Sequence, residues 1–150
     1  MPKNDELLCR AKQKGTDEWV EGYYCKYERT NPDGKVNTTH MIVPYYASAL
    51  YGIEIDPETV GRCTGLPDVN GKMIFGGDIV KYCSPNIFGI IRFEKYGNPG
   101  STIKTHLGFC IDWHDNGMLF RKDIAFFTDQ YGVQIEVIGN IHDSPELLKG

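Results

Sequence analysis

The sequence predicts a mainly β protein, and three observations support that fold class. Seventeen glycines and eight prolines supply many turn positions, while seven Phe, nine Tyr and two Trp supply rings that suit a pleated surface. Short apolar or alternating segments recur at spacings of roughly 8–12 residues, as they do in small barrels. Asn70-Gly71 is a strong hairpin signal, because a type I′ turn needs positive φ at both central residues.

The N-terminal part is expected to be a β subdomain over about residues 10–59, after a flexible lead-in at 1–9. Alternation of side chains from Trp19 to Tyr27 predicts a strand with two distinct faces. A return strand completes a hairpin and ends at Pro44, because proline has no N–H for the ladder. The other elements expected here are short strands at 10–13 and 53–55, the return strand at 36–43, a turn at 30–35, and a helical turn at 56–60 that Asp56 caps and Pro57 begins.

The C-terminal part, about residues 60–150, is expected to be a barrel-like core. Asn70 and Gly71 should form the tip of a two-residue hairpin, and Gly77-Asp78 should turn the chain into the first long strand. Residues 122–131 combine helical spacing with β-favouring rings, so helix and strand both stay open there. The other elements expected are strands at 79–83, 88–94, 104–113, 118–121 and 134–139, loops at 84–86 and 96–102, a tight turn at 115–117 and a helix start at 143–148.

Length and composition argue against several classes of protein. The 150 residues fit one domain, or two small subdomains that share a core. The net charge of −4 argues against sequence-independent binding to nucleic-acid backbones, which requires clustered Lys and Arg. No apolar run approaches the ~18 residues of a membrane span. The polar N-terminus lacks the apolar segment of a signal peptide, so neither membrane insertion nor secretion is expected.

The cysteines indicate structural thiols. They are odd in number, widely spaced and without a CxxC pair, so reduced, buried side chains are the simplest interpretation. The five positions are Cys9, Cys25, Cys63, Cys83 and Cys110.

Residues 112–115 form the densest cluster of ionisable groups. Strand alternation places Asp112 and His114 on one face, which is compatible with a general base or a metal site; a solvated strand end before a turn explains the cluster as well. Cys110 lies four residues before His114, but with only His106 nearby a zinc ligand set is incomplete. No phosphate loop, dinucleotide fingerprint, nucleophile elbow or HExxH motif occurs. We therefore assign no catalytic residue, metal or cofactor.

Two further motifs have a structural interpretation beside a functional one. Asp68 opens a segment similar to a calcium loop, but the Gly is fourth rather than sixth and the twelfth position is Ile79, so an Asx turn is expected instead. Two groups of tyrosines could stack on nucleic-acid bases, or could close a small β core with their hydroxyls at its rim. These groups are Tyr23, Tyr24 and Tyr27, and Tyr45, Tyr46 and Tyr51.

Residues 64–80, TGLPDVNGKMIFGGDIV, strongly resemble the central signature of the YopX family of bacteriophages and prophages. Residues 17–23 resemble the family's EWVxGY strand, residues 56–61 its DPETVG turn, and residues 136–148 its C-terminal EVIGNIxxxPELL motif. The motifs occur in the expected order over nearly the whole chain. One departure is Gly76, because the family usually carries an acidic residue before Gly-Asp-Ile-Val.

The resemblance implies a mainly β fold whose C-terminal part, about residues 60–142, is similar to an SH3-type barrel. It also implies a phage or prophage origin and a place in the bacterial cytoplasm. It implies no activity, because the family is uncharacterised and SH3-like barrels serve many roles. The positions matching the central signature are expected to be structural: Gly65, Leu66, Asp68, Asn70, Gly71, Gly77, Asp78, Ile79 and Val80.

Three functional hypotheses follow. The first is a non-enzymatic binding or adaptor module with a protein partner, because no catalytic constellation is recognisable. The second is nucleic-acid binding through the barrel face. The third is an enzyme that uses Asp112, His114 or a cysteine. Exposed edge strands often pair, so a homo-oligomer is compatible with the sequence, which indicates neither symmetry nor number.

Overall fold

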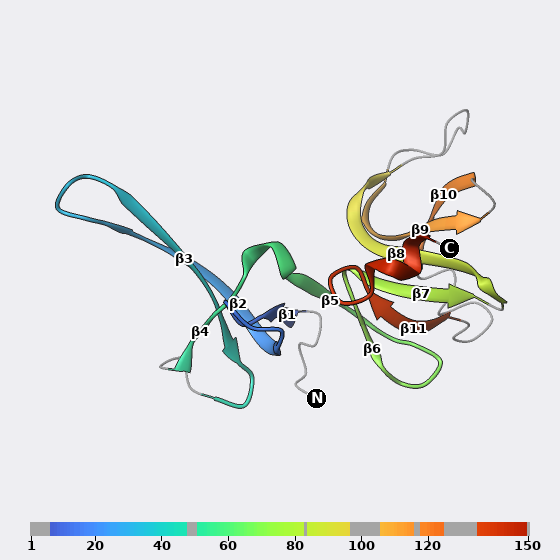
Figure 1. Ribbon diagram of the computed structural model, residues 1–150, viewed down its shortest axis with the longest axis horizontal. Coiled ribbons are helices and arrows are strands. Elements are labelled where there is room, and N and C mark those ends of the chain that lie inside the picture. The colour runs from blue at the N-terminus through green and yellow to red at the C-terminus, as the bar shows by residue number, and fades with distance from the viewer. Residues whose placement is uncertain are drawn as a thin grey trace. The chain divides into compact units, whose positions relative to one another are not determined.

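The computed structural model describes residues 7–47, 51–82, 84–96, 106–115, 118–124 and 135–149. The chain divides into two compact units, residues 1–63 and residues 64–150, each with a hydrophobic cluster of its own (Figure 1). Both units are built from antiparallel strands, which confirms the mainly β class. Within the described ranges, no helix has the length and apolar character that crossing a membrane requires.

The first unit is an antiparallel sheet dominated by one long hairpin. Its strands lie in the order β4-β3-β2-β1, and the first residues of β5 pair with β1. The bounds are β1 (Cys9–Lys12), β2 (Trp19–Thr30), β3 (Val36–Pro44), β4 (Ile53–Glu54) and β5 (Gly61–Pro67).

The hairpin of β2 and β3 extends well beyond its neighbours in the first unit, as its blue and cyan ribbons show (Figure 1). β1 pairs with β2 only as far as Gly22, and β4 pairs only with Met41 and Ile42 of β3. Residues 23–40, called the arm below, therefore form a two-stranded ribbon. Every β2 residue from 23 to 30 is exposed, so the arm has solvent on both faces.

The core of the first unit lies on one face of the sheet, nearer the base of the arm. Val20 of β2 and its cross-strand neighbour Ala11 share this face, as alternation requires. Ile42 and Ile55 join them and are almost completely buried. The whole cluster is Cys9, Ala11, Val20, Ile42 and Ile55, with Ile53 and Val60 packed against it.

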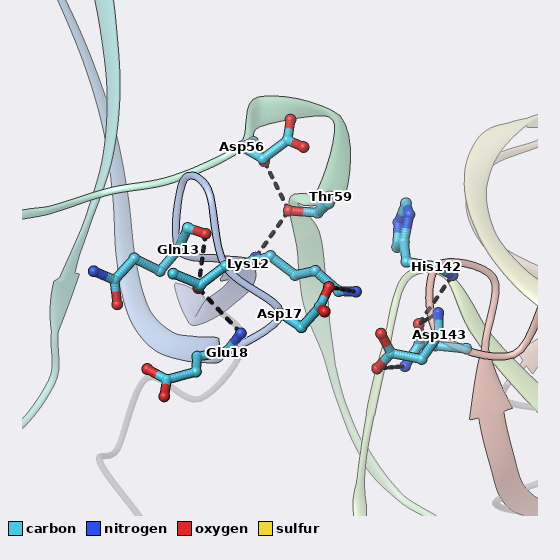
Figure 2. Close-up of polar contacts among 10 residues, drawn as sticks. Lys12, Gln13, Asp17, Glu18, Asp56, Thr59, His142 and Asp143 are labelled. Atoms are coloured by element: carbon cyan, nitrogen blue, oxygen red, sulfur yellow. Dashed lines mark hydrogen bonds and ion pairs between the residues drawn. The ribbon is translucent and has the colours of Figure 1, made fainter.

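A short 3-10 helix, η3 (Pro57–Thr59), is held against β1 by the Thr59 hydroxyl and by a backbone hydrogen bond from the Asp56 N–H to the Lys12 carbonyl at 2.9 Å. The buried Thr59 hydroxyl donates to the Asp56 carbonyl at 2.7 Å and accepts from the Lys12 N–H at 2.8 Å (Figure 2). Asp56 caps the helix as predicted, since its Oδ1 accepts a hydrogen bond from the Glu58 N–H at 3.2 Å.

Gly22 stands where the arm begins, opposite Pro44 on one side and Cys9 on the other. A Cβ atom at this position would overlap the carbonyl oxygen of Val43 and lie 2.8 Å from the Cα of Pro44. Because both neighbours are backbone atoms, no rotamer change relieves this overlap. The two strands approach here only because residue 22 has no side chain.

The second unit contains a five-stranded antiparallel sheet in the order β10-β9-β8-β7-β11. β7 to β10 follow one another as a meander, and β11 returns to pair with β7. The bounds are β6 (Met73–Phe75), which pairs with β5, β7 (Asp78–Tyr82), β8 (Ser84–Tyr96), β9 (His106–Asp115), β10 (Met118–Asp123), β11 (Ile135–Asn140) and the 3-10 helix η5 (Pro145–Lys149).

The core of the second unit is built from β-branched residues of successive strands. Ile91 and Ile111 lie opposite each other in β8 and β9, and both are almost completely buried. The cluster comprises Ile74, Val80, Ile91, Ile111, Trp113, Ile124 and Ile135.

Several sequence-based expectations for the second unit are corrected. Residues 84–86 belong to β8 rather than to a loop, because pairing resumes between Tyr82 and Ser84 after an irregularity in the register. Both sheets are open over the described residues, so an SH3-type barrel across 60–142 is not confirmed. The expected loop at 97–102, the turn residues 116–117 and residues 125–131 lie outside the described ranges.

Candidate functional site

Asp68 organises the loop at the centre of the predicted family signature. One carboxylate oxygen, Oδ1, accepts hydrogen bonds from the N–H groups of Asn70 at 2.9 Å and Lys72 at 2.8 Å. The other, Oδ2, accepts from the N–H of Val137 at 2.9 Å. With 3% of its surface exposed, Asp68 serves the backbone of its own loop and of β11. The first two bonds form the expected Asx turn.

The hairpin predicted around Asn70 and Gly71 exists, but its loop has five residues rather than two. Strand β5 ends at Pro67 and β6 begins at Met73. The Gly71 N–H bonds to the Asp68 carbonyl at 3.0 Å, and Gly71 has φ +81°. The two-residue type I′ prediction was wrong because the Asp68 carboxylate stabilises a wider loop by accepting two of its N–H groups.

The Gly77-Asp78 pair lies at the start of β7, as predicted. Gly77 has φ +89°, and the fully buried carboxylate of Asp78 accepts a hydrogen bond from the Phe75 N–H at 2.8 Å. Ile79 and Val80 follow and are fully buried. Two further signature positions, Gly65 with φ +77° and Leu66, which packs on the core, lie in β5.

The C-terminal motif also makes backbone contacts. Asn140 Oδ1 accepts hydrogen bonds from the N–H groups of His142 at 3.0 Å and Asp143 at 2.9 Å (Figure 2). A Cβ at Gly139 would lie 2.9 Å from the Ser144 hydroxyl and 3.0 Å from Leu147, so glycine lets the tail approach β11. The family resemblance in this region therefore coincides with a close-packed corner.

Asp112 is paired with a neighbour in the sheet. Its Oδ2 lies 3.2 Å from Nε of Arg92, and its side chain is 12% exposed. Cys110 is fully buried, and its thiol lies 3.8 Å from a carboxylate oxygen of Glu94. The backbone of His114 pairs with that of Phe88 in the register of β9 and β8. The described residues contain no group of His, Cys, Asp and Glu suited to hold a metal ion.

The described cysteines are thiols rather than disulfides, and they differ in exposure. Cys9, Cys63 and Cys110 are buried, whereas Cys25 lies exposed on the arm. Burial raises the pKa of the Cys9 thiol above its ordinary value of 9.0, while the charge of Arg62 and a hydrogen bond from the Tyr24 backbone act in the opposite direction. Cys9 is therefore poorly suited to act as a nucleophile, since the thiolate is the reactive form.

A pocket of about 400 Å³ lies in the first unit beside the arm. Three segments form it: the turn after β1, strand β3 and the segment between β4 and η3. Backbone hydrogen bonds join them, from Lys14 N to Glu54 O and from Ile55 N to His40 O, both at 3.0 Å. The lining residues are Lys14, Gly15, Thr38, His40, Glu54, Ile55, Asp56 and Pro57. This volume falls within the range of ligand pockets, about 300–1,000 Å³.

His40 belongs to the arm and also lines the pocket. Its Nδ1 lies 2.6 Å from the Tyr24 hydroxyl, and the two rings are stacked with centroids 6.0 Å apart. Tyr24 is 39% exposed, so this pair is accessible to a partner. Lys14 is engaged by Glu54, with Nζ and Oε1 3.0 Å apart.

The exposed tyrosines of the arm contradict the alternative that they close a core. Tyr23 is 37% exposed and Tyr27 52% exposed, on the face opposite Tyr24. Trp19 shares their face, and the cations of Arg10 and Lys12 lie 4.9 Å and 5.6 Å from its ring centroid. Tyr45, Tyr46 and Tyr51 are also exposed.

The sequence predicted the signature positions but missed the pocket. Lys14, His40 and Glu54 are separated by more than a dozen residues each, and no motif connects them. One signal in the sequence could have predicted the exposed arm next to the pocket. Strand β2 continues beyond Tyr27 to Thr30 with polar groups on both of its faces. A segment of this kind cannot be buried on either side.

Comparison with protein-family models identifies a family for this chain. The model of the YopX protein family matches residues 8–149, which is nearly the whole chain. No curated protein and no solved structure matches. With all four resembling motifs inside the matched range, the chain belongs to the YopX protein family.

Proposed function

We propose that this protein is a non-enzymatic binding module that recognises a protein partner with the arm and the adjoining pocket. The observation that carries the proposal is the Tyr24–His40 pair, because it joins an exposed aromatic ring to the wall of a pocket. Exposed tyrosines beside a pocket are typical of the residues that dominate protein interfaces.

The charges of the pocket favour a peptide segment over a phosphate group. Two carboxylates, those of Glu54 and Asp56, line it, and its lysine is engaged by Glu54. A polar or basic side chain of the partner therefore fits this pocket better than an anion does.

Nucleic-acid binding is the second candidate, supported by a different surface. Trp19, Tyr23 and Tyr27 share one face of β2, and Arg10 and Lys12 lie beside the Trp19 ring. Aligned rings with adjacent cations resemble platforms for unpaired bases. Against it stands the net charge of −4. An enzyme using Asp112, His114 or a cysteine is less supported, since Asp112 is paired with Arg92.

The family resemblance supports a proposal about where the protein comes from and where it acts. We propose a phage or prophage origin, action in the bacterial cytoplasm, and a C-terminal part related to SH3-type barrels. The meander from β7 to β10, with β11 returning to β7, is compatible with that relation. The roles proposed for the signature residues are structural, with Asp68 and Asp78 holding backbone N–H groups.

The test is affinity capture from phage-infected or lysogenic cells, followed by binding measurements with the purified partner. The His40→Ala variant should weaken binding at least about tenfold, as loss of an interface hot spot does. Leu107→Ser removes an exposed apolar side chain from the second unit and should leave binding unchanged. Equal binding by both variants would contradict the proposed surface. Salt-dependent recovery of nucleic acid would favour the second candidate, and turnover abolished by a point mutation would favour the enzyme.

A further inference from the structure

The outer edge of β2 is free along the arm in the described part of the chain. β3 pairs with one side of β2 from Gly22 to Thr30, and β1 pairs with the other side only from Trp19 to Gly22. The segment from Tyr23 to Thr30 therefore has no strand on its outer edge, and all its residues are exposed. At the base of this edge the Tyr24 N–H donates to the Cys9 thiol, so the fully free backbone groups begin after Tyr24. Such an edge is a template for a further strand.

The hydrogen-bonding phase of the arm determines which backbone groups point toward this free edge. The Asn31 N–H bonds to the Lys35 carbonyl at 2.8 Å, which makes Asn31 and Lys35 a hydrogen-bonded pair. Bonded and non-bonded pairs alternate along an antiparallel ribbon. Counting back from Asn31, the N–H and C=O groups that point outward belong to Tyr24, Lys26, Glu28 and Thr30. By the same count, the N–H and C=O groups of Gly22 also point outward. This agrees with the observed pairing of Gly22 with Cys9 of β1, which lies on that side.

A second copy of the same edge fits this one in one two-fold register. When Tyr27 lies on the axis, Lys26 faces Glu28 of the other copy and Glu28 faces its Lys26. The paired segment then runs from Tyr24 to Thr30, which matches the free length of the edge. Lys26 and Glu28 then use both their N–H and C=O groups in hydrogen-bonded pairs, and the Tyr24 C=O accepts from the Thr30 N–H of the other copy, while the Tyr24 N–H keeps its bond to the Cys9 thiol. Tyr27 meets its copy as a close non-bonded aromatic pair.

Neighbouring registers of the same phase are unfavourable. An axis at Lys26 places the two Lys26 side chains opposite each other, and an axis at Glu28 does the same for the two carboxylates. An axis at Cys25 places Glu28 opposite Gly22, where β1 already occupies the edge. Charge and free length therefore select the same register.

We propose that two copies of this chain associate by antiparallel pairing of their β2 edges about Tyr27, which joins the arms into a four-stranded sheet. The association requires no ordering of new backbone, because the arm is already extended. It also stabilises the arm, since an isolated two-stranded ribbon is marginally stable and a four-stranded sheet is not. The pocket residues Thr38 and His40 lie on β3, on the other side of the arm, and stay accessible.

Reciprocal charge exchange tests the register in the full-length chain. Lys26→Glu and Glu28→Lys each place like charges opposite each other across the axis, so each should weaken self-association at least about tenfold by sedimentation equilibrium. The double variant restores opposite pairs and should recover association to within about threefold. Lys35→Glu makes the same charge change in the turn, outside the register, and should have no effect. A monomer at every concentration, or single exchanges without effect, would overturn the proposal.

Disulfide trapping provides a second measurement that does not depend on affinity. In the proposed register Cys25 lies opposite Arg29 of the other copy in a non-bonded pair, where Cα atoms are about 4.5 Å apart and a disulfide is geometrically allowed. Mild oxidation of Arg29→Cys should therefore give a covalent dimer. Thr30→Cys puts the thiol on the opposite face of the sheet and should not. Equal cross-linking of both variants, or of neither, would refute the register.

Discussion

At the scale of single residues, buried polar groups of this chain act mainly on its own backbone. Asp68 and Asp78 are both buried and both accept backbone N–H groups. Asn140 does the same at the C-terminal corner. These polar side chains of the family motifs are therefore engaged in structural hydrogen bonds, whereas the β2 side chains of the arm are exposed.

Replacing Asp68 with Ala should reduce the free energy of unfolding by about 3 kcal/mol, because three N–H donors lose a buried acceptor. Denaturant titration measures the loss. Asp33→Ala is the matched control, since Asp33 accepts only from the Lys35 N–H in an exposed turn. An effect of Asp68→Ala no larger than that of the control would show that the loop does not depend on this carboxylate.

Gly71→Val should destabilise the protein by about 1–2 kcal/mol, because valine is strained at the observed φ of +81°. A Cβ at Gly71 would have no atom within 4 Å, so a steric clash does not contribute. Gly108→Val is the control, because its Cβ is equally unobstructed and no positive φ is required there. Thermal unfolding of the two variants should separate backbone strain from the added side chain.

The Cys9 thiol gives the protein a defined sensitivity to alkaline pH. Its pKa is raised by burial, so the folded state holds the proton more tightly than the unfolded state. The corresponding stability is complete below the ordinary pKa of 9.0 and is lost as pH rises through the raised value. Unfolding free energies of wild type and Cys9→Ser, measured from about pH 7 to about pH 10, should therefore converge at the alkaline end. A constant difference would contradict this linkage.

At the scale of elements, the most consequential contact of the first unit is that between η3 and β1. One hydroxyl, that of Thr59, connects the Lys12 N–H to the Asp56 carbonyl. Asp56 and the preceding two residues line the pocket. The position of the pocket wall therefore depends on a hydrogen bond in the core of the unit.

Thr59→Val should lower the free energy of unfolding by about 1–3 kcal/mol, because the Lys12 N–H loses its buried acceptor. Thr59→Ser keeps the hydroxyl and should retain most of this stability. Chemical denaturation of the two variants provides the comparison. A loss in Thr59→Ser as large as that in Thr59→Val would show that the hydroxyl is not the main stabilising group of this contact.

The sequence was a better guide to elements than to the ways in which they meet. Alternation predicted β2, and capping chemistry predicted the turn at Asp56, because both depend on neighbouring residues alone. The loop at Asp68 was mispredicted because the Asp68 carboxylate accepts two N–H groups of a wider loop, and its third bond, from Val137, was beyond local reasoning because Val137 is distant in sequence. The strand at 84–86 was missed because Pro85 indicated a loop, whereas pairing with β7 resumes there. The pocket requires three separated segments and was inaccessible to local reasoning.

At the scale of the whole molecule, the described residues form two separate hydrophobic clusters. The cluster around Ile42 contains residues of the first unit only, and the cluster around Ile111 contains residues of the second unit only. β5 alone contributes residues to both units. Each cluster should therefore control the protection of its own strands.

Ile42→Val and Ile111→Val each remove one buried methylene and should each cost about 1 kcal/mol. Native-state hydrogen exchange should then show weaker protection of β1 and β2 amides in the first variant, and of β8 and β9 amides in the second. Identical patterns of lost protection in both variants would indicate a single cooperative unit.

Gly22 has a consequence for how this family varies over evolution. The Val43 carbonyl and Pro44 occupy the space that any side chain at this position would need. Selection should therefore act on residue 22 through steric exclusion, independently of what the exposed part of the arm does. Residues further along the arm face solvent and are free to diverge with their partners. Among relatives that retain this hairpin, glycine should persist at its base while the exposed tyrosines change. Relatives with alanine at the equivalent position should have lost the close approach of β2 to Val43 and Pro44.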